Sequence, residues 1–263
     1  MEQKPTRKWS RSCQNVVKGT LEVLYESILL QKLGGGKFGI VGFSLRNDHT
    51  GTKPLYWNFP EMSEIAKEFE LISKADFKVA YVHWGVEYID HPSWQQQKMG
   101  HWLIDLGFDL VVGMHPHVLQ GYEVYKGKHI FYSLGNFVFN MAHRPTHYGA
   151  VVGIEEDNHK VMVEYVEIGE DFCPRIVSER DIPQAYQFHT LNKKIPCYDN
   201  TETFIAEAQA GLKAYRKSNR KNFLKHIHKY NRNVLWGMVI DFIKRKIHKD
   251  KQYDTSNTHD WGG

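Results

Sequence analysis

The sequence predicts an α/β fold with a mixed sheet, and three observations support this prediction. Short apolar runs, bounded by Gly, Asp or Asn, recur through the first two thirds of the chain as buried strands do. A stretch with helical spacing of its large side chains separates two of these runs. Two alternating segments joined by a short polar turn then follow. Together they predict parallel strands connected through a helix, with antiparallel strands in the same domain.

The apolar runs predict four strands. Their sequences are FGIVGF at 38–43, FKVAYV at 77–82, DLVVG at 109–113 and HIFYSL at 129–134. They are rich in β-branched and aromatic residues, which pack well on a pleated surface. Because each run is short and lies next to turn-forming residues, we expect strands rather than segments of buried helix.

The segment 92–106 predicts a helix between the second and third strands. Its large side chains recur at helical spacing: Trp94, Lys98, Trp102, Leu103 and Leu106. Ser93 is a typical first-turn cap, and Gly107 is a typical residue at which a helix stops. A strand, helix, strand unit of this kind is normally a right-handed crossover, so the two strands should be parallel and should end at the same edge of the sheet.

Two further patterns complete the predicted organisation. GAVVGIEE and KVMVEYVEI, separated by residues 157–159, predict an antiparallel hairpin. From Thr203 to about Lys249 the pattern is helical, and residues 213–250 hold 12 Lys and Arg against 2 Asp and Glu. We therefore divide the chain into a divergent segment 1–37, a domain 38–200 and a basic helical tail 201–263.

Composition bounds the class of protein. The chain has 263 residues with 41% hydrophobic and 24% charged, which is typical of a globular domain. It contains neither a run of about 18 apolar residues nor an apolar secretion signal at its start. Cys13, Cys173 and Cys197 form no CxxC pair, so neither a disulfide framework nor a cysteine zinc site is predicted. We expect a cytoplasmic or peripheral membrane location.

Three histidines stand at predicted strand ends. His83 follows the second strand, and the third strand runs into His115-Pro116-His117. In an extended segment, residues two apart project to the same side, so both imidazoles of the HxH pair would enter one pocket. Imidazole suits zinc, iron and manganese, and such ions activate water or stabilise phosphoryl oxygens. The alternative is ordinary hydrogen-bonded or surface histidines, because the chain contains 15 of them.

Three motifs, taken with their order and spacing, resemble a known family. HWGVEY, GFDLVVGMHPHVLQGYEVY and IFYSLGNFVF are similar to segments of the bacterial capsule synthesis proteins of the CapA type, over about residues 38–167. That family is similar to the calcineurin-like metallophosphoesterases. The resemblance implies a layered α/β/β/α sandwich with divalent metal ions at the carboxyl edges of its strands. It also implies a part in making or exporting poly-γ-glutamate or another capsule polymer.

The resemblance also assigns site residues. It implies that His83 and His115 bind one metal ion and His117 the other, the ions being Mn, Fe or Zn. Glu87 matches the acidic position of the family after HWG and, together with His117, is expected to be catalytic. A carboxylate beside a cation orients water or exchanges a proton with it. The alternative for Glu87 is a surface glutamate in a loop.

The block YSLGNF supplies the expected substrate contacts. Gly135 permits backbone angles that other residues disfavour, and Asn136 offers an amide to a substrate. The alternative is a turn at the end of a strand, with Phe137 and Phe139 in the core.

The sequence also departs from the family pattern. A strand ending in Gly-Asp and an Asn-His block, which supply carboxylate and amide ligands in the family, are missing, while KGTLEVLYESILL resembles the helix that follows that block. The fold is therefore expected to be incomplete at its N-terminal end. Two adjacent cations need bridging carboxylates, and three neutral imidazoles provide none, so a two-metal centre should not assemble fully. Three histidines and a water can hold one zinc ion, which leaves the expected number of ions at one or two.

Two functions follow as predictions. The first is metal-dependent, phosphoesterase-like hydrolysis in capsule or poly-γ-glutamate biosynthesis or export. The second is a noncatalytic accessory module whose basic residues 213–249 bind an anionic polymer or a membrane surface. No motif that reads RNA or DNA accompanies this charge, so no specific nucleic-acid partner is expected.

Overall fold

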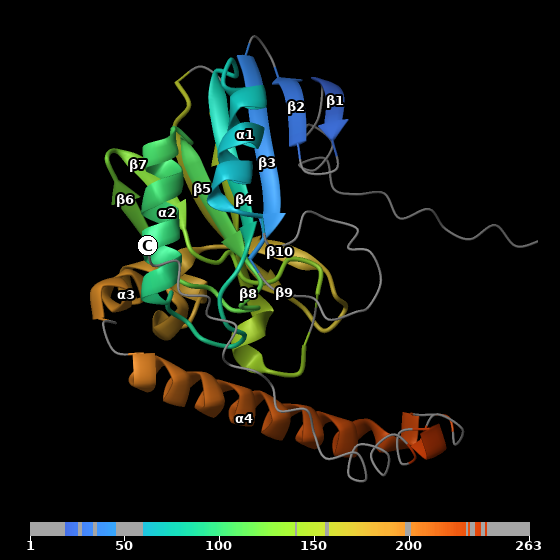
Figure 1. Cartoon of the computed structure of the whole chain (residues 1–263). Coiled ribbons are helices and arrows are strands. Elements are labelled where there is room, and N and C mark those ends of the chain that lie inside the picture. Colours follow the sequence, from blue (N-terminus) through green and yellow to red (C-terminus); the bar gives the residue numbers. More distant parts are fainter. Residues whose placement is uncertain are drawn as a thin grey trace, which may run out of the picture.

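The computed structural model describes residues 19–25, 28–33, 36–45, 60–139, 141–155, 158–197, 201–229, 231, 235–237 and 240. They form two sheets with helices, which confirms the predicted mixed α/β fold (Figure 1). The larger sheet has the strand order β1-β2-β3-β4-β5-β7-β6. Its strands are β1 (Gly19–Tyr25), β2 (Ile28–Leu33), β3 (Gly36–Ser44), β4 (Phe77–His83), β5 (Leu110–Met114), β6 (Tyr122–Tyr125) and β7 (Lys128–Phe131).

The centre of the larger sheet is parallel and its edges are antiparallel. β3, β4, β5 and β7 run in the same direction, whereas β2 and β6 pair antiparallel with their neighbours. The predicted strands at 38–43, 77–82, 109–113 and 129–134 correspond to these four central strands. Between β3 and β7, two elements were not predicted: β6 and the helix α1 (Met62–Ile72).

The second sheet contains the predicted hairpin. β8 (Tyr148–Ile154) and β9 (Val161–Ile168) pair antiparallel, with Ile154 opposite Val161, and β10 (Pro174–Val177) adds a third strand beside β9. Short helical segments connect or follow these strands: η2 (Arg144–His147), η3 (Glu179–Asp181), η4 (Gln184–Tyr186), α3 (Phe188–Leu191) and η5 (Asn192–Cys197).

Two apolar clusters define the layers. On one face of the larger sheet, α1 and α2 (Trp94–Leu106) pack on strand residues; this cluster includes Val41, Ile65, Phe69, Ala80, Val82, Met99, Leu103, Val111 and Ile130. The other face packs on the second sheet; that cluster includes Phe38, Phe77, Val79, Leu110, Val112, Phe131, Tyr148, Ala150 and Tyr165. The layers are therefore helices, larger sheet and smaller sheet.

The helix α2 begins and ends as predicted, and its buried face overlaps the predicted stripe in part: Leu103 is buried, and Trp102 and Leu106 pack against the core. The Ser93 side chain accepts a hydrogen bond from the Gln96 backbone N–H, and Gly107 follows the last turn with φ 125°. The buried positions are Gln96, Met99, Gly100, Leu103 and Ile104. Trp94 and Trp102 are half-buried and Lys98 is exposed, its ammonium lying 4.1 Å from the centre of the Trp94 ring.

The prediction of a helix from KGTLEVLYESILL is wrong. Gly19–Tyr25 and Ile28–Leu33 form the antiparallel strands β1 and β2 instead. β2 pairs along β3, from Leu33 opposite Gly36 to Ile28 opposite Val41. Pairing with an open sheet edge satisfies the backbone of both strands, and this tertiary context overrides the local helical pattern.

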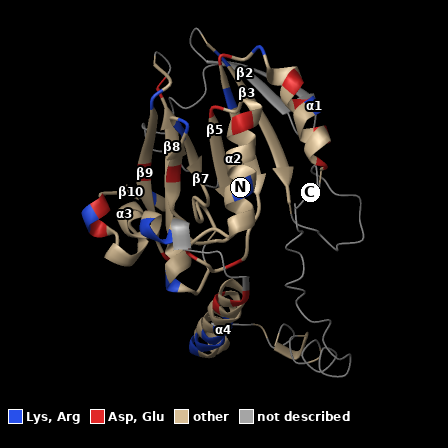
Figure 2. Cartoon of the chain, turned by 60° about the vertical axis from the view of Figure 1, so that its left-hand side comes forward, with Lys and Arg blue, Asp and Glu red and all other residues tan. Residues whose placement is uncertain are grey.

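The basic tail begins with a long helix, α4 (Thr201–His226), which continues into η6 (Ile227–Lys229). Figure 1 shows α4 lying across the ends of the layers, at the end of the sheet toward which β3 points. Lys and Arg gather along it (Figure 2). Most of the apolar stripe expected between Leu235 and Ile243 lies outside the described residues. Among the helices that the structure describes, none is long and apolar enough to cross a bilayer.

Candidate metal centre

The ends of β4 and β5 bring three histidines together. His83 is the last residue of β4 and pairs in register with Met114, the last residue of β5. The ring centres of His83 and His115 are 4.5 Å apart, and those of His115 and His117 are 5.7 Å apart. A parallel β4-α2-β5 unit produces this arrangement, because its strands end at one edge of the sheet.

The HxH pair does not lie in an extended segment, so that premise of the sequence analysis is wrong. β5 ends at Met114, and both histidines have positive φ, 104° at His115 and 61° at His117. Non-glycine residues with such angles are uncommon and gather at functional sites. The two imidazoles approach each other because the backbone turns sharply, not because of strand alternation.

Glu87 joins this cluster from the loop that follows β4. One ligand atom from each of Glu87, His115 and His117 lies within 4.8 Å of the others. The next residue, Tyr88, has φ 66° and donates its backbone N–H to the carbonyl oxygen of Pro116 at 2.8 Å. That hydrogen bond ties the Glu87 loop directly to the HxH turn.

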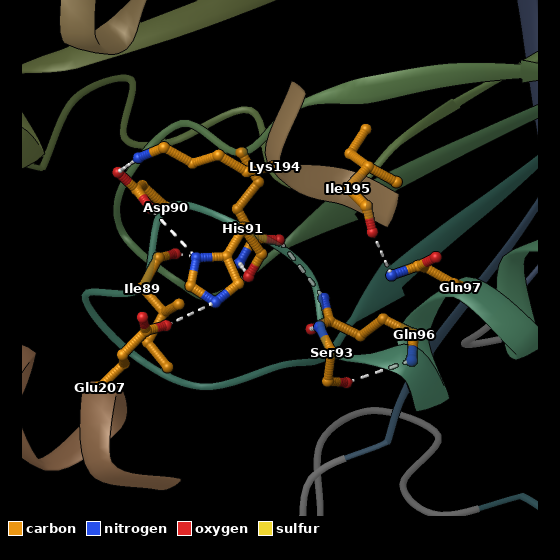
Figure 3. A network of polar contacts seen from close by, with 10 residues as sticks. Ile89, Asp90, His91, Ser93, Gln96, Gln97, Lys194, Ile195 and Glu207 are labelled. Atoms are coloured by element: carbon orange, nitrogen blue, oxygen red, sulfur yellow. Dashed lines mark hydrogen bonds and ion pairs between the residues drawn. The ribbon is translucent and has the colours of Figure 1, made fainter. Parts of the chain in front are cut away.

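The same loop is anchored at its far end by a buried amide. Gln120 Nε2 donates to the carbonyl oxygens of Ile89 and His91, at 3.0 and 2.9 Å. His91 is buried, with Nδ1 3.2 Å from an Asp90 oxygen and Nε2 3.1 Å from a Glu207 oxygen of α4 (Figure 3). The position of Glu87 is thus fixed from both sides of the loop.

Asn136 lies behind His117 and fixes the tautomer of its ring. Asn136 Nδ2 donates to the carbonyl oxygen of Thr146 at 3.1 Å, so Asn136 Oδ1 is the atom that faces His117 Nδ1 at 3.0 Å. A carbonyl oxygen only accepts, and His117 Nδ1 therefore carries the proton. The lone pair of the neutral ring is then on Nε2, as a metal ligand requires.

Gly135 and its neighbours form the wall beside this contact. Gly135 has φ 69°, and a Cβ added there would lie 2.5 Å from the carbonyl oxygen of Tyr148. Asn136 is only 7% exposed. The expected substrate contacts of these two residues stay predictions, while the structure shows Asn136 holding His117.

The expectation that Phe137 and Phe139 lie in the core is wrong. Their side chains are 50% and 56% exposed, and Val138 between them is 57% exposed. The Phe139 ring centre lies 5.7 Å from that of His117. This apolar segment therefore borders the histidine cluster instead of filling the interior.

Sequence reasoning missed the aromatic residues around the cluster. Tyr88 stacks against His117 with ring centres 6.1 Å apart, and against Tyr215 of α4 at 4.2 Å. His143 meets both tyrosines edge-on, at 6.0 and 6.3 Å. Burial, reinforced by the nearby His147, holds the pKa of His143 below its usual range. Of these residues, only Tyr88 could have been singled out from the sequence, because it belongs to the motif HWGVEY.

The donor set fits one divalent ion. Two imidazoles and one carboxylate within reach of each other are a ligand set used by catalytic zinc and non-haem iron sites. His83, the third histidine predicted as a ligand, has its ring beside His115 but is not among the three residues whose ligand atoms all lie within 4.8 Å of one another. Among the described residues, Glu87 is the one carboxylate in this group. Two adjacent cations would need more negative charge than a single carboxylate provides, so the group suits one ion.

Comparison with known proteins agrees with the motifs. Residues 23–141 match the family model of the bacterial capsule synthesis protein PGA_cap. The capsule biosynthesis protein CapA of Bacillus anthracis is 44% identical over 93 residues, covering 35% of this chain and 23% of that protein. The PGA biosynthesis protein CapA of Bacillus subtilis is 40% identical over 113 residues, covering 42% of this chain and 28% of that protein. The predicted resemblance is confirmed.

These matches cover only parts of the proteins compared. The chain spans about a quarter of the length of the two Bacillus relatives. A crystal structure of a hypothetical protein from Thermus thermophilus aligns with a TM-score of 0.30 and 13% identity, over 57% of this chain and 58% of that one. That similarity is too slight to bear on the site.

Proposed function

We propose, from the match of residues 23–141 to the bacterial capsule synthesis family, that this chain takes part in capsule polymer biosynthesis or export as a metal-dependent hydrolase of phosphoester-like bonds. The two Bacillus relatives are named for capsule and PGA biosynthesis, which supports the pathway. The observation that carries the chemistry is the convergence of Glu87, His115 and His117.

The protein residues have distinct tasks in this proposal. His115 and His117 bind the ion through neutral rings, and Asn136 keeps the His117 lone pair on Nε2. Glu87 supplies the negative charge and reduces the net charge of the loaded site. His83 borders this group through its ring, which lies beside that of His115. When bound, a divalent ion activates water and stabilises developing charge on phosphoryl oxygens.

The number of donors also favours particular ions. Three protein donors leave zinc, which prefers four ligands, with a single open position. Manganese and iron accept more ligands, so they keep positions open for water and substrate. We therefore expect manganese or iron to support activity better than zinc.

Metal binding is the first test. We would measure metal content after purification and titrate Mn²⁺, Fe²⁺ and Zn²⁺ calorimetrically into the wild type, His115→Ala and His117→Ala. His189→Ala, on an exposed histidine, is the matched control. Binding near one ion per chain that is lost only in the first two variants supports the proposal. A wild type that binds none of the three ions refutes it.

Hydrolysis is the second test, with bis(p-nitrophenyl) phosphate as the probe. Turnover that needs added metal and is lost in Glu87→Gln supports the reaction class. If the protein binds metal but does not hydrolyse the probe, the proposed hydrolase activity is refuted, and a noncatalytic module that binds metal is indicated instead.

A second candidate function rests on the charge of α4. Six exposed cations, with no acidic residue among them, occupy its second half: Lys213, Arg216, Lys217, Arg220, Lys221 and Lys225. A row of like charge attracts linear polyanions. We infer binding of an anionic polymer such as poly-γ-glutamate here, tested by titrating that polymer against the wild type and a Lys217→Glu, Lys221→Glu variant. Equal affinity of the two proteins refutes it, and binding to anionic vesicles alone identifies a membrane surface instead.

A further inference from the structure

The helix α4 contacts the Glu87 loop along several successive turns. Phe204 and Ala208 form an apolar cluster with Ile89, against which Val86 also packs. Glu207 lies against His91, as Figure 3 shows. These contacts involve a helix outside residues 23–141, the part of the chain that matches the family model.

Farther along, α4 reaches the residue next to Glu87. A Cβ added at Gly211 would lie 3.0 Å from the carbonyl oxygen of Tyr88, so a small residue lets the helix approach the loop. One turn later the Tyr215 ring stacks on Tyr88, with centres 4.2 Å apart and planes inclined by 16°. His143 Nδ1 also lies 3.3 Å from Ser218 Oγ.

The stacking continues through the candidate ligand. Tyr88 and His117 have ring planes inclined by 25° at 6.1 Å, and His117 and Phe139 by 31° at 5.7 Å. Phe139, His117, Tyr88 and Tyr215 thus form a row of four roughly parallel rings. This row connects α4 to the ring that Asn136 holds from its other side.

The loop needs such support because of its backbone. Tyr88 has φ 66° and Gly85 has φ 81°, and a non-glycine residue with positive φ persists only where its surroundings hold it. The Pro116 carbonyl holds Tyr88 from one side and the Tyr215 ring covers it from the other. Without the ring of Tyr215, Tyr88 and the adjacent Glu87 lose one of these two restraints.

We propose that α4 is a working part of the metal centre, in which Tyr215 acts as a positioning residue that holds Tyr88, and through it Glu87 and His117, in the arrangement that binds the ion. This inference rests on the proposed metal-binding function. It extends the site beyond residues 23–141, which match the family model, to a helix whose own residues include none of the candidate ligands.

The test compares three variants of the full chain. Tyr215→Ala removes the stacked ring, Tyr215→Phe keeps it, and Asn222→Ala alters an exposed, uncharged position of the same helix. We would measure Mn²⁺ affinity by calorimetry and backbone hydrogen exchange of residues 84–91. Because supporting residues typically change metal affinity by about 10–100-fold, we expect Tyr215→Ala to bind at least about 10-fold more weakly, with faster exchange in the loop. Tyr215→Phe and Asn222→Ala should match the wild type.

The outcomes separate this inference from the function on which it rests. A wild type that binds Mn²⁺, with unchanged affinity and exchange in Tyr215→Ala, overturns the inference and leaves the metal site standing. A wild type that binds no ion refutes both. Circular dichroism and thermal unfolding of Tyr215→Ala show whether the fold is intact, since Tyr215 lies outside the two main apolar clusters. Rescue by Tyr215→Phe then shows that the ring is what the site requires.

Discussion

At the scale of single residues, Asn136 determines which nitrogen of His117 faces the ligand cluster. Replacing it with Ala removes the acceptor of the Nδ1 proton and leaves the Thr146 carbonyl without that amide donor. The ring is then free to rotate or change tautomer, so we expect Asn136→Ala to bind Mn²⁺ about 10–100-fold more weakly. Isothermal titration measures this directly.

The control for that prediction is an exposed asparagine with a similar number of hydrogen bonds. Asn158 donates to Glu155 and accepts from the Lys160 backbone, and neither partner belongs to the candidate ligand group. Asn158→Ala should bind metal as the wild type does. If Asn136→Ala also keeps full affinity while folded, Asn136 does not position His117.

Gly113 gives a second prediction, this time on stability. A Cβ at this position in β5 would lie 2.2 Å from the Tyr132 carbonyl oxygen and 2.3 Å from Trp84 Nε1. Those two atoms share a hydrogen bond of 2.9 Å, which the methyl group would separate. We expect Gly113→Ala to lower the free energy of unfolding by about 2–4 kcal/mol, measured by urea denaturation.

A strand glycine with room around it provides the comparison. At Gly153 in β8 the nearest contact of an added Cβ is the end of the Met162 side chain at 3.7 Å. Gly153→Ala should change the free energy of unfolding by less than about 1 kcal/mol. Equal losses in the two variants would show that the close packing around Gly113 is not the cause.

At the scale of elements, the ion pair between Asp90 and Lys194 attaches η5 to the Glu87 loop. Burial raises the pKa of Asp90, but hydrogen bonds from His91 and Lys194 outweigh it and hold the pKa below its ordinary value. A carboxyl whose pKa is lowered by folding stabilises the protein above its ordinary pKa. That contribution disappears as the pH falls through the lowered value.

Asp90→Asn should therefore have a pH-dependent effect. Near about pH 6 we expect its melting temperature to be a few degrees below that of the wild type, a modest loss because both side chains are about one third exposed. As the pH falls through the lowered pKa of Asp90, the two proteins should melt closer together, since the wild-type carboxyl then becomes protonated. A constant difference across this range would exclude the ion pair as its source.

The elements that were predictable are those whose pattern is set locally. β3, β4, β5 and β7 are short apolar runs beside turn residues, and α2 has Ser93 and Gly107 at its ends. β1 and β2 were missed because edge pairing with β3 decides their conformation, and such pairing has no local pattern. α1 was not predicted although its buried Ile65, Phe69 and Ile72 follow helical spacing.

Candidate ligands of the site could be predicted from the sequence, whereas the residues and turns that position them could not. Of the residues predicted for the site, Glu87, His115 and His117 have ligand atoms within 4.8 Å of one another, whereas His83 lies beside His115 but outside that group. The positive φ of both HxH residues, and the exposure of Phe137 and Phe139, depend on how the turns pack. Tyr215 lies far along the chain from Tyr88, so no spacing rule connects them.

At the scale of the whole molecule, a bound ion would add a direct connection between the loop after β4 and the turn after β5. Its candidate donors are Glu87 in that loop and His115 and His117 in that turn, and α4 packs over the loop. The unfolded chain does not hold these donors together. Metal should therefore bind the native state selectively and stabilise it.

The expected size of this effect follows from mass action. At a free ion concentration about 100 times the dissociation constant, binding to the native state alone adds about 2.7 kcal/mol, which for a domain of this size raises the melting temperature by about 5–10 °C. Thermal unfolding with Mn²⁺, followed by excess EDTA, measures it. His115→Ala should show no shift, whereas His189→Ala, whose histidine is exposed outside the cluster, should shift fully. An equal rise in His115→Ala would place the bound ion elsewhere on the protein, because that variant lacks a donor that the proposed centre requires.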